Sequence, residues 1–502
     1  MNNLSWLQMT LALLLTGCTT LKPVDLPDET ASAPAAAPLW TELNAAQPDD
    51  WFLLLNEGTA ALDWRLRAIA SATESLDLQT FLWKVDQTGL RLFRQILEAA
   101  DRGVRVRLLL DDSFTVGEND LIYDFAQHPH IEFRIYNPFR HRPDSMALRQ
   151  LLNLGEFSRI DHRMHNKTMI IDNRAVILGG RNLADEYFGQ HETGNFRDME
   201  LLCAGPIVQK ISNQFDAFWN NNWSFPAEQV LNRPSPEHDL EHYRTALHKI
   251  SKKGPDESPG QRKQFWINAA VGGASGRAAL LADIPAKSNP ADHGELPNQL
   301  AYELIEWIDR AQEELILVSA YLIPTPELEA AVERAEKRGV EVRILTNSLQ
   351  SNNHTAAHSA YRHHVHRLIH HGADLHEVRS HAKDRSHYMR MPVDDKKLGL
   401  HAKLMLIDRK DVFIGSANMD PRSLTLNTEI GLFIESPVLN RQLRELLEID
   451  FDKRNAWHLQ VTESGHIVWV SDETTRDSQP ADSTFQRLED WFLGKLPIEA
   501  KM

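Results

Sequence analysis

Short apolar runs alternate with stretches of helical spacing in both halves of the chain. Residues 76–83 and 104–110 are apolar runs that predict β-strands, and residues 90–100 between them place apolar side chains on one face of a helix. The second half repeats this order, with a strand, a helix and a strand predicted over 315–321, 328–337 and 338–345. A strand, a helix and a second strand form the βαβ unit of a largely parallel sheet, so the pattern predicts an α/β fold.

The repeat between the two halves has a constant spacing. Gly103 and Gly339, each of which precedes the second strand of its unit, lie 236 residues apart. A recurrence at fixed spacing is typical of a duplicated domain. We therefore predict two domains related by a pseudo-twofold axis, each a mostly parallel or mixed sheet flanked by helices, over residues 41–225 and 296–460.

Four further segments flank or connect these domains. An apolar leader occupies residues 1–18, and residues 19–40 are rich in Pro, Ala and Thr, which predicts a flexible tether. Residues 226–295 have poor apolar periodicity and predict a connecting segment with exposed loops near the site. The C-terminal extension over 461–502 contains an apolar stretch at 491–497, which we expect to dock on the body of the protein, with a membrane surface as the alternative.

The overall composition is that of a soluble globular protein. Of the 502 residues, 42% are hydrophobic and 25% are charged, which excludes a membrane bundle and a disordered chain. With 54 basic and 70 acidic side chains, the formal net charge is −16. Proteins that bind nucleic acid usually carry a basic excess, so we expect no nucleic-acid partner.

The two cysteines, Cys18 and Cys203, predict no disulfide framework. Cys203 lies in an apolar run and is expected to be a small buried residue. Cys18 follows the apolar stretch 4–15 and small residues, which resembles the lipobox of bacterial lipoproteins. The resemblance implies cleavage before Cys18, diacylation of its sulfur and anchoring to a periplasm-facing membrane surface, and Thr19 favours the outer membrane. An uncleaved anchor or a wrongly assigned start is the alternative, because no Lys or Arg precedes the apolar stretch.

One pattern of polar residues occurs in both halves, again 236 residues apart. Each copy has a histidine, a lysine two positions later, an aspartate five positions after the lysine, and an asparagine that follows glycine. The members are His165, Lys167, Asp172 and Asn182 in the first half and His401, Lys403, Asp408 and Asn418 in the second. Because residues i and i+2 of a strand share a face, each histidine projects together with its lysine. The two aspartates are expected in turns at strand ends, where they are the least suited to contact a substrate.

This set of residues suits chemistry on a phosphodiester. A neutral imidazole can attack phosphorus to give a phosphohistidine, and a second, protonated imidazole can donate to the leaving oxygen. Lysine cations and asparagine amides can hold the phosphate oxygens, so no metal and no cofactor is expected. We expect Asp198 to orient His165 and Glu429 to orient His401, as the third member of a triad orients its base. The alternative is that both carboxylates are ordinary exposed strand residues.

The two copies of H-x-K-x4-D with their trailing asparagines resemble the phospholipase D superfamily. Longer stretches are similar to its bacterial cardiolipin synthase C-like branch, namely residues 75–83, 102–112, 163–167, 180–188, 346–349 and 496–499. The likeness covers about residues 50 to 500 and implies two phospholipase D-like domains. It also implies a metal-independent phosphatidyltransferase that makes cardiolipin from phosphatidylglycerol and a second phospholipid. Within the superfamily the N-terminal histidine is commonly the nucleophile, which implies this role for His165 and leaves the reverse assignment open.

Histidines cluster between residues 354 and 387. His363, His366 and His370 have helical spacing, and without cysteines or a carboxylate pattern a solvated helix face is favoured over a metal site. The resemblance places His358 and Tyr361 near the pocket as secondary site residues.

Four functions remain in view, led by transphosphatidylation on a membrane-facing lipoprotein with phospholipid substrates. A hydrolytic phospholipase D would use the same phosphohistidine with water as acceptor. An endonuclease of the same superfamily would need a basic groove and would bind with steep salt dependence. A non-catalytic lipid-binding scaffold is disfavoured by two complete sets of reactive residues.

Overall fold

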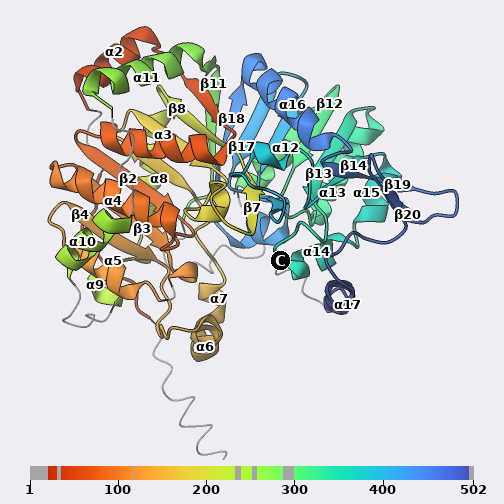
Figure 1. The fold of residues 1–502 in the computed structure, drawn as a ribbon, viewed down its shortest axis with the longest axis horizontal. Helices are drawn as coiled ribbons and strands as arrows, with labels where there is room; N and C mark the ends of the chain where they lie inside the picture. The colour runs from red at the N-terminus through yellow and green to blue at the C-terminus, as the bar shows by residue number, and fades with distance from the viewer. Residues whose placement is uncertain are drawn as a thin grey trace, which may run out of the picture.

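Each half of the chain builds its own sheet, and the two sheets lie beside each other with helices on their outer sides (Figure 1). The computed structural model describes residues 21–30, 35–115, 117–231, 239–250, 257–285 and 299–496. The predicted α/β class and the two related domains are confirmed. The leader with Cys18 lies outside the described residues. Among the described helices, none has the length and apolar character needed to cross a bilayer.

The first sheet joins nine described strands in the order β10-β1-β8-β6-β5-β2-β3-β4-β9. Only β2, β3 and β4 run parallel to one another, and the other pairs are antiparallel, so the sheet is mixed. The bounds are Trp51–Leu55 for β1, Ser75–Thr80 for β2, Arg105–Asp111 for β3, Ile131–Tyr136 for β4, Thr168–Ile171 for β5, Ala175–Gly179 for β6, Glu200–Ala204 for β8, Ser224–Pro226 for β9 and Ala274–Ser275 for β10.

The second sheet joins ten described strands in the order β11-β18-β17-β16-β12-β13-β14-β19-β20-β21. Its centre, from β18 to β14, repeats the order from β8 to β4 of the first sheet, with β12, β13 and β14 parallel. The bounds are Arg277–Ala282 for β11, Glu314–Val318 for β12, Glu341–Asn347 for β13, Asp374–Val378 for β14, Leu404–Ile407 for β16, Asp411–Gly415 for β17, Ile430–Glu435 for β18, Ala456–Val461 for β19, Ile467–Val470 for β20 and Thr475–Arg476 for β21.

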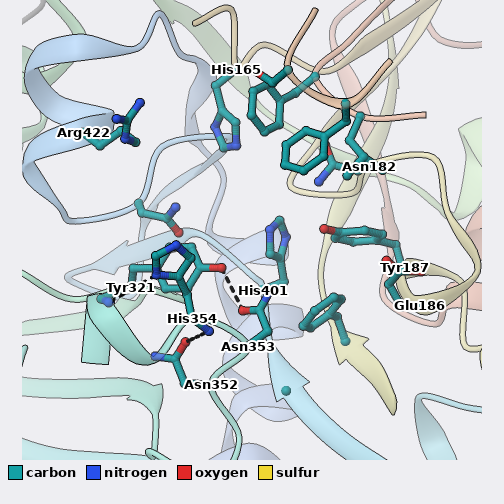
Figure 2. A pocket seen from close by; sticks show the side chains of 18 of the residues that line it. His165, Asn182, Glu186, Tyr187, Tyr321, Asn352, Asn353, His354, His401 and Arg422 are labelled. Atoms are coloured by element: carbon teal, nitrogen blue, oxygen red, sulfur yellow. Dashed lines mark hydrogen bonds between the residues drawn. The ribbon is translucent and has the colours of Figure 1, made fainter. Parts of the chain in front are cut away.

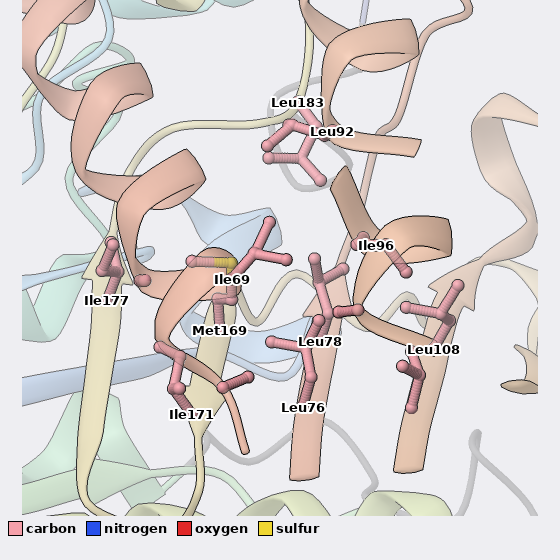
Figure 3. Packing of buried hydrophobic residues seen from close by; sticks show 14 of the residues in the cluster. Ile69, Leu76, Leu78, Leu92, Ile96, Leu108, Met169, Ile171, Ile177 and Leu183 are labelled. Carbon is pink, nitrogen blue, oxygen red and sulfur yellow. The ribbon is translucent and has the colours of Figure 1, made fainter. Parts of the chain in front are cut away.

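Successive side chains of a strand point to opposite faces of the sheet, and nearly all side chains of the central strands are apolar and buried, so each sheet has two apolar faces. On the outer face of the first sheet, Ile69 and Ile96 of the covering helices pack on strand residues such as Leu78 (Figure 3). The inner faces of both sheets share one core, in which Val176 of β6 and Ile414 of β17 belong to the same cluster. The covering helices are α3 (Gly58–Ser71), α4 (Gln87–Asp101) and α5 (Asn119–Ala126) on the first sheet, α12 (Gln299–Arg310), α13 (Pro326–Lys337) and α15 (Val365–His371) on the second, and α8 (Ile207–Trp219) and α16 (Pro437–Phe451) beside the shared core.

The predicted connecting segment is not a run of loops where the structure describes it. It forms α9 (Ala227–Val230), α10 (Leu240–Ile250) and α11 (Pro259–Gly272), and then contributes β10 to the first sheet and β11 to the second. Trp266 of α11 is fully buried and packs edge-on against Trp40 at a centroid distance of 5.1 Å. Helix α11 is anchored by one large buried side chain, that of Trp266. A single large side chain produces no repeating pattern of apolar positions, so the sequence does not predict the helix.

The predicted tether is also wrong for its described residues. The amide of Val24 donates to the carbonyl of Asn222 at 2.8 Å, and the Glu29 carboxylate pairs with Arg105 and Arg134. Further on, α2 (Pro38–Ala46) buries Trp40 in the first core. Specific partners far away in the sequence hold this segment on the body, and its Pro-rich and Ala-rich composition carries no sign of them.

Candidate active site

His165 and His401 line the same cavity, which lies between the two halves and has a volume of about 900 Å³. Their rings enter from opposite sides and point toward each other (Figure 2). Each histidine precedes a short buried strand, β5 or β16, which fixes the backbone behind it. Asn182 and Asn418, which follow the next strand in each half, line the cavity as well.

Each imidazole is held by a carboxylate from the other half of the chain. Nδ1 of His165 lies 2.9 Å from both carboxylate oxygens of Glu429. Nδ1 of His401 lies 2.6 Å from Oδ2 of Asp198. The predicted partners are therefore exchanged, and the expectation that each acid orients the histidine of its own half is wrong. Because Nδ1 is engaged, Nε2 of each ring is the atom left for chemistry.

His401 is paired with the carboxylate of the other half because a short sheet joins the two halves. Strand β15 (Lys397–Leu400) pairs in parallel with β7 (Gly194–Arg197), with the last residues of both strands opposite each other. The next residue on one side is His401 and on the other Asp198. The His401 amide continues this pairing by donating to the carbonyl of Arg197 at 2.8 Å.

An equivalent bridge explains the partner of His165. Met164 forms a parallel bridge with Thr428, and the His165 amide donates to the Thr428 carbonyl at 2.9 Å. The residues that follow this bridge are His165 and Glu429. The register of the backbone pairing therefore places this imidazole next to this carboxylate, as it does for His401 and Asp198. Both pairings link backbone across the halves, and a strand of four residues or a single bridge gives too little pattern to be predicted.

Burial controls the protonation of both histidines. Burial lowers the pKa of His165 well below its ordinary value, and the nearby lysines Lys167 and Lys403 lower it further. Burial together with Lys403 lowers the pKa of His401 to about 3. Both imidazoles are consequently neutral near pH 7, which is the form that a nucleophile or a base requires.

The two orienting carboxylates differ in charge. Burial acts to raise the pKa of Asp198, but the neighbouring His401 and the ammonium of Lys403 hold it below its usual range. Burial raises the pKa of Glu429 to about 7, although Lys167 opposes the shift. Asp198 is therefore ionised at neutral pH, whereas Glu429 titrates close to it.

The two lysines lie behind the histidines and are absent from the cavity wall. Nζ of Lys167 donates to the carbonyl of His165 at 2.7 Å, and Lys403 donates to that of His401. Burial lowers the pKa of Lys167 to about 7 and that of Lys403 to about 8. The lysine cations expected at the phosphate oxygens are instead buried ammonium groups that bind backbone carbonyls and titrate near neutral pH.

The motif aspartates occupy the expected turns and bind backbone. Asp172 and Asp408 have positive φ angles of 53° and 49°, and neither lines the cavity. The carboxylate of Asp172 accepts the amides of Thr73, Glu74 and Ser75, and that of Asp408 accepts those of Gln312, Glu313 and Glu314. Their placement in the catalytic set is wrong: the carboxylates fix the chain just before the central strands β2 and β12.

The predicted secondary pocket residues are wrong. His358 and Tyr361 lie on α14 (Thr355–Tyr361) but are buried away from the cavity. Nδ1 of His358 lies 2.9 Å from Oδ1 of Asp490, and the Tyr361 hydroxyl donates to Glu377 at 3.0 Å. The chain reaches the cavity at the start of α14 instead, through Ala357 and through His354, which precedes the helix.

Several cavity residues carried no motif that could single them out. The ring of Phe81 meets His165 edge-on at 4.8 Å, and that of Tyr187 meets His401 at 4.9 Å. Other members of the wall are Phe114, Phe139, Met146, Phe157, Ile160, Arg163, Tyr321, His354, Ala357 and Arg422. Some signals existed, because Phe81, Arg163 and Tyr187 belong to the stretches at 75–83, 163–167 and 180–188, and His354 belongs to the histidine cluster. Much of the wall is aromatic or aliphatic.

The histidine cluster separates into a solvated part and a bound part. His363, His366 and His370 are exposed at the start and along one side of α15, which confirms a solvated face. The described residues also bring together one group of potential metal ligands: Asp374, His376 and His458. Nε2 of both histidines lies within 3.0 Å of Oδ1 of Asp374, and Arg343 approaches its other oxygen at 3.7 Å. None of these residues lines the cavity.

Comparison with known proteins gives one family. A family model described as cardiolipin synthase, PLD-like domain, matches residues 66–219 and 304–451. Cardiolipin synthase C of Escherichia coli (strain K12) is 34% identical over 464 residues, covering 89% of this chain and 94% of the relative. Cardiolipin synthase B of the same strain is 25% identical over 413 residues, covering 81% and 80%. The solved structure of phosphatidylserine synthase from Haemophilus influenzae Rd KW20 has a similar fold, with a TM-score of 0.53, 14% identity and coverage of 82% and 90%.

Proposed function

The chain belongs to the family of cardiolipin synthases with phospholipase D-like domains, and we propose that it makes cardiolipin by moving a phosphatidyl group from phosphatidylglycerol to a second phospholipid. At the level of the family it is a phospholipid phosphatidyltransferase. The observation that carries the proposal is the pair of neutral, carboxylate-bound imidazoles, His165 and His401, in one cavity with an apolar wall.

In the proposed first step, Nε2 of His165 attacks the phosphorus of phosphatidylglycerol. A phosphorus–nitrogen bond forms, the bond from phosphorus to the glycerol oxygen breaks, and the imidazolium of His401 gives its proton to the leaving oxygen. In the second step, a hydroxyl of the second phospholipid attacks the phosphohistidine and passes its proton to His401. His165 is released and the catalytic proton returns to its starting place.

The roles of the two histidines follow from their carboxylates. The acid must carry a proton, and the ionised Asp198 stabilises an imidazolium at His401. Glu429, which titrates near neutral pH, gives His165 less support as a cation, and His165 is therefore assigned the role of nucleophile, which needs no proton. A phosphodiester anion in the cavity favours the cationic forms of His401, Lys167 and Lys403, so substrate binding shifts the protonation of the acid and of the two lysines toward the charged forms.

The cavity wall supports a lipid substrate over a nucleic acid. Aromatic and aliphatic side chains such as Phe81, Phe139 and Ile160 suit acyl chains and glycerol backbones. The net charge of −16 opposes association with a polyanion. Water in place of the lipid hydroxyl would turn the same intermediate into phosphatidate, which is the product that separates a hydrolase from a synthase.

We also propose that the chain is a lipoprotein acylated at Cys18 and facing the periplasm. The small residues before Cys18 and the apolar stretch at 4–15 support this assignment. Metabolic labelling with a fatty acid should mark the wild-type chain and fail to mark Cys18→Ser. Equal labelling of both chains would contradict it.

The test of the activity is product analysis with the purified chain and vesicles that contain phosphatidylglycerol. Wild type should form cardiolipin, whereas His165→Ala and His401→Ala should each lower the rate at least about 10³-fold, as loss of a triad member does. His366→Ala, on the exposed side of α15, is the matched control and should keep the full rate. Phosphatidate as the sole product would identify a hydrolase, and no turnover of any phospholipid by wild type would defeat the proposal.

A further inference from the structure

Two apolar projections, one from each half, extend from the lower side of the molecule in Figure 1. The first consists of α6 (Met146–Leu152), the 3-10 turn Leu154–Glu156 and α7 (Phe157–Ile160), and the second is α17 (Thr484–Leu493). Together they are called the apolar rim. Its exposed large apolar side chains are Leu148, Leu151, Leu152, Leu154 and Phe157 in the first projection and Phe485, Leu488, Trp491, Phe492 and Leu496 at the second.

The first projection shows only uncharged side chains to the outside. From residue 145 to residue 158, every exposed residue is apolar, small or a neutral amide or hydroxyl. The charged residues of this stretch turn inward, since Arg149 is fully buried and donates to Thr115 at 3.1 Å, and Glu156 pairs with Arg159. The first projection therefore exposes leucine side chains to the surroundings, while its charged side chains form hydrogen bonds and ion pairs within the protein.

Helix α17 is amphipathic in the reverse of the usual sense. Its inward face is polar, because Asp490 is 1% exposed and binds His358 and Arg362 of α14 and the turn after it at 2.9 and 3.1 Å. Its outward face carries the apolar residues, with Phe485 at 73% exposure, and one exposed charged side chain, Glu489. A helix that only covers a protein core buries its apolar stripe and exposes its charges. The predicted docking of this segment on the body therefore occurs through polar contacts and leaves its apolar side free.

Both projections border the candidate active site. Met146 and Phe157 of the first projection line the cavity, and so does Asp482, which lies two residues before α17. The apolar wall of the cavity is thus continuous with the outer surface of the first projection. Any surface that covers the rim also lies next to the cavity.

The N-terminal end of the described chain leads to the same place. The Leu21 amide donates to the carboxylate of Glu156, within the first projection. Cys18 lies three residues earlier in the sequence. A chain of three residues spans at most about 11 Å, so an acyl group on Cys18 would enter a membrane beside this projection.

We propose that the apolar rim docks into the surface of a phospholipid bilayer and holds the cavity against it. The inference rests on the proposed function, which supplies phospholipid substrates and an acylated Cys18. At the edge of α17, Nζ of Lys495 lies 3.6 Å from the ring centroid of Trp491, a pairing of aromatic ring and cation suited to the boundary between headgroups and acyl chains. Phospholipids then reach the cavity from the bilayer without passing through water.

Labelling at single cysteines tests the docking directly. In a Cys18→Ser background the remaining cysteine, Cys203, is fully buried, so Leu151→Cys and Leu488→Cys can each carry an environment-sensitive fluorophore. Vesicles of phosphatidylglycerol and phosphatidylethanolamine should shift both labels to the blue and raise their intensity at least twofold. A label at Val271→Cys on α11, which is 76% exposed on a different part of the molecule, should not respond. Unchanged spectra at both rim positions, or a change that follows protein concentration without vesicles, would overturn the proposal.

Kinetics separate docking from catalysis. The double variant Leu151→Ser/Leu488→Ser should turn over phosphatidylglycerol in vesicles at least tenfold more slowly than wild type, and short-chain phosphatidylglycerol below its micelle concentration at the same rate. Val271→Ser is the matched control and should behave as wild type on both substrates. An equal loss on both substrates, or a loss on neither, would contradict the docking role. Absence of cardiolipin with wild type would defeat the proposed function alone, because the fluorescence result does not depend on turnover.

Discussion

The two histidines of the cavity stand against carboxylates of unequal charge. Asp198 is ionised behind His401, whereas the pKa of Glu429 behind His165 is raised to about 7 by burial. A carboxylate that stabilises an imidazolium matters most where the imidazole must carry a proton. In the proposed mechanism, the acid–base histidine therefore depends more on its partner than the nucleophile does.

Replacing each carboxylate by its neutral amide tests how much each histidine depends on its partner. We expect Asp198→Asn to lower kcat by roughly 10²- to 10⁴-fold, in the range known for the acid of a triad, and Glu429→Gln to lower it less. The measurement is kcat for cardiolipin formation at saturating phosphatidylglycerol, with unfolding curves to show that both variants are folded. A larger loss for Glu429→Gln would exchange the roles of His165 and His401.

The buried lysines predict a dependence of stability on pH. Burial lowers the pKa of Lys167 to about 7 and that of Lys403 to about 8, so between these values and the ordinary lysine pKa the folded chain binds fewer protons than the unfolded chain. Stability consequently rises with pH in this window, by up to about 1.4 kcal/mol per pH unit for each lysine. Urea unfolding from pH 7.5 to 9.5 should show a smaller slope for Lys167→Met/Lys403→Met than for wild type. Equal slopes would mean that the lysines keep their ordinary pKa in the folded chain.

At the scale of single residues, sequence reasoning found the reactive types and missed their partnership. The constant spacing of 236 residues singled out both histidines, both lysines and both asparagines. A pseudo-twofold repeat is equally consistent with an acid from the same half or from the other half. Only the backbone pairings at Leu400 and Met164 decide between them, and these have no counterpart in the sequence pattern.

At the scale of elements, the best predicted parts are those with apolar periodicity. The structure confirms the βαβ unit of each half, as β2, α4 and β3 and as β12, α13 and β13. Elements held by a few distant contacts were missed, such as α11 with its buried Trp266 and the segment anchored by Glu29. A window along the sequence detects a face of several apolar residues and cannot detect one ring or one ion pair.

The turn aspartates offer a test at this scale. The Asp172 carboxylate is buried and accepts the amides of Thr73, Glu74 and Ser75 as well as Nε1 of Trp40. We expect Asp172→Ala to lower the free energy of unfolding by roughly 3 kcal/mol, because these buried donors lose a charged acceptor. The folded fraction should keep the kcat of wild type. A large loss of kcat with unchanged stability would instead assign Asp172 a direct part in the chemistry.

At the scale of the whole molecule, neither half contains a complete pair of cavity histidine and orienting carboxylate. His165 relies on Glu429, and His401 relies on Asp198, so each base belongs to one half and its acid to the other. The shared inner core and the pairing of β7 with β15 keep the halves in register. The wall of the cavity comes from both halves, and the apolar rim also draws one projection from each.

Trapping of the intermediate tests the central claim most directly. Phosphatidylglycerol labelled in its phosphate would be mixed with the full chain, quenched in base within one turnover and followed by peptide mapping. We predict label on His165 in wild type, more label on His165 in His401→Ala if a donor with a good leaving group is used, and none in His165→Ala. Label on His401 in the His165→Ala variant would reverse the assignment, and turnover to cardiolipin without label on either histidine would contradict the account.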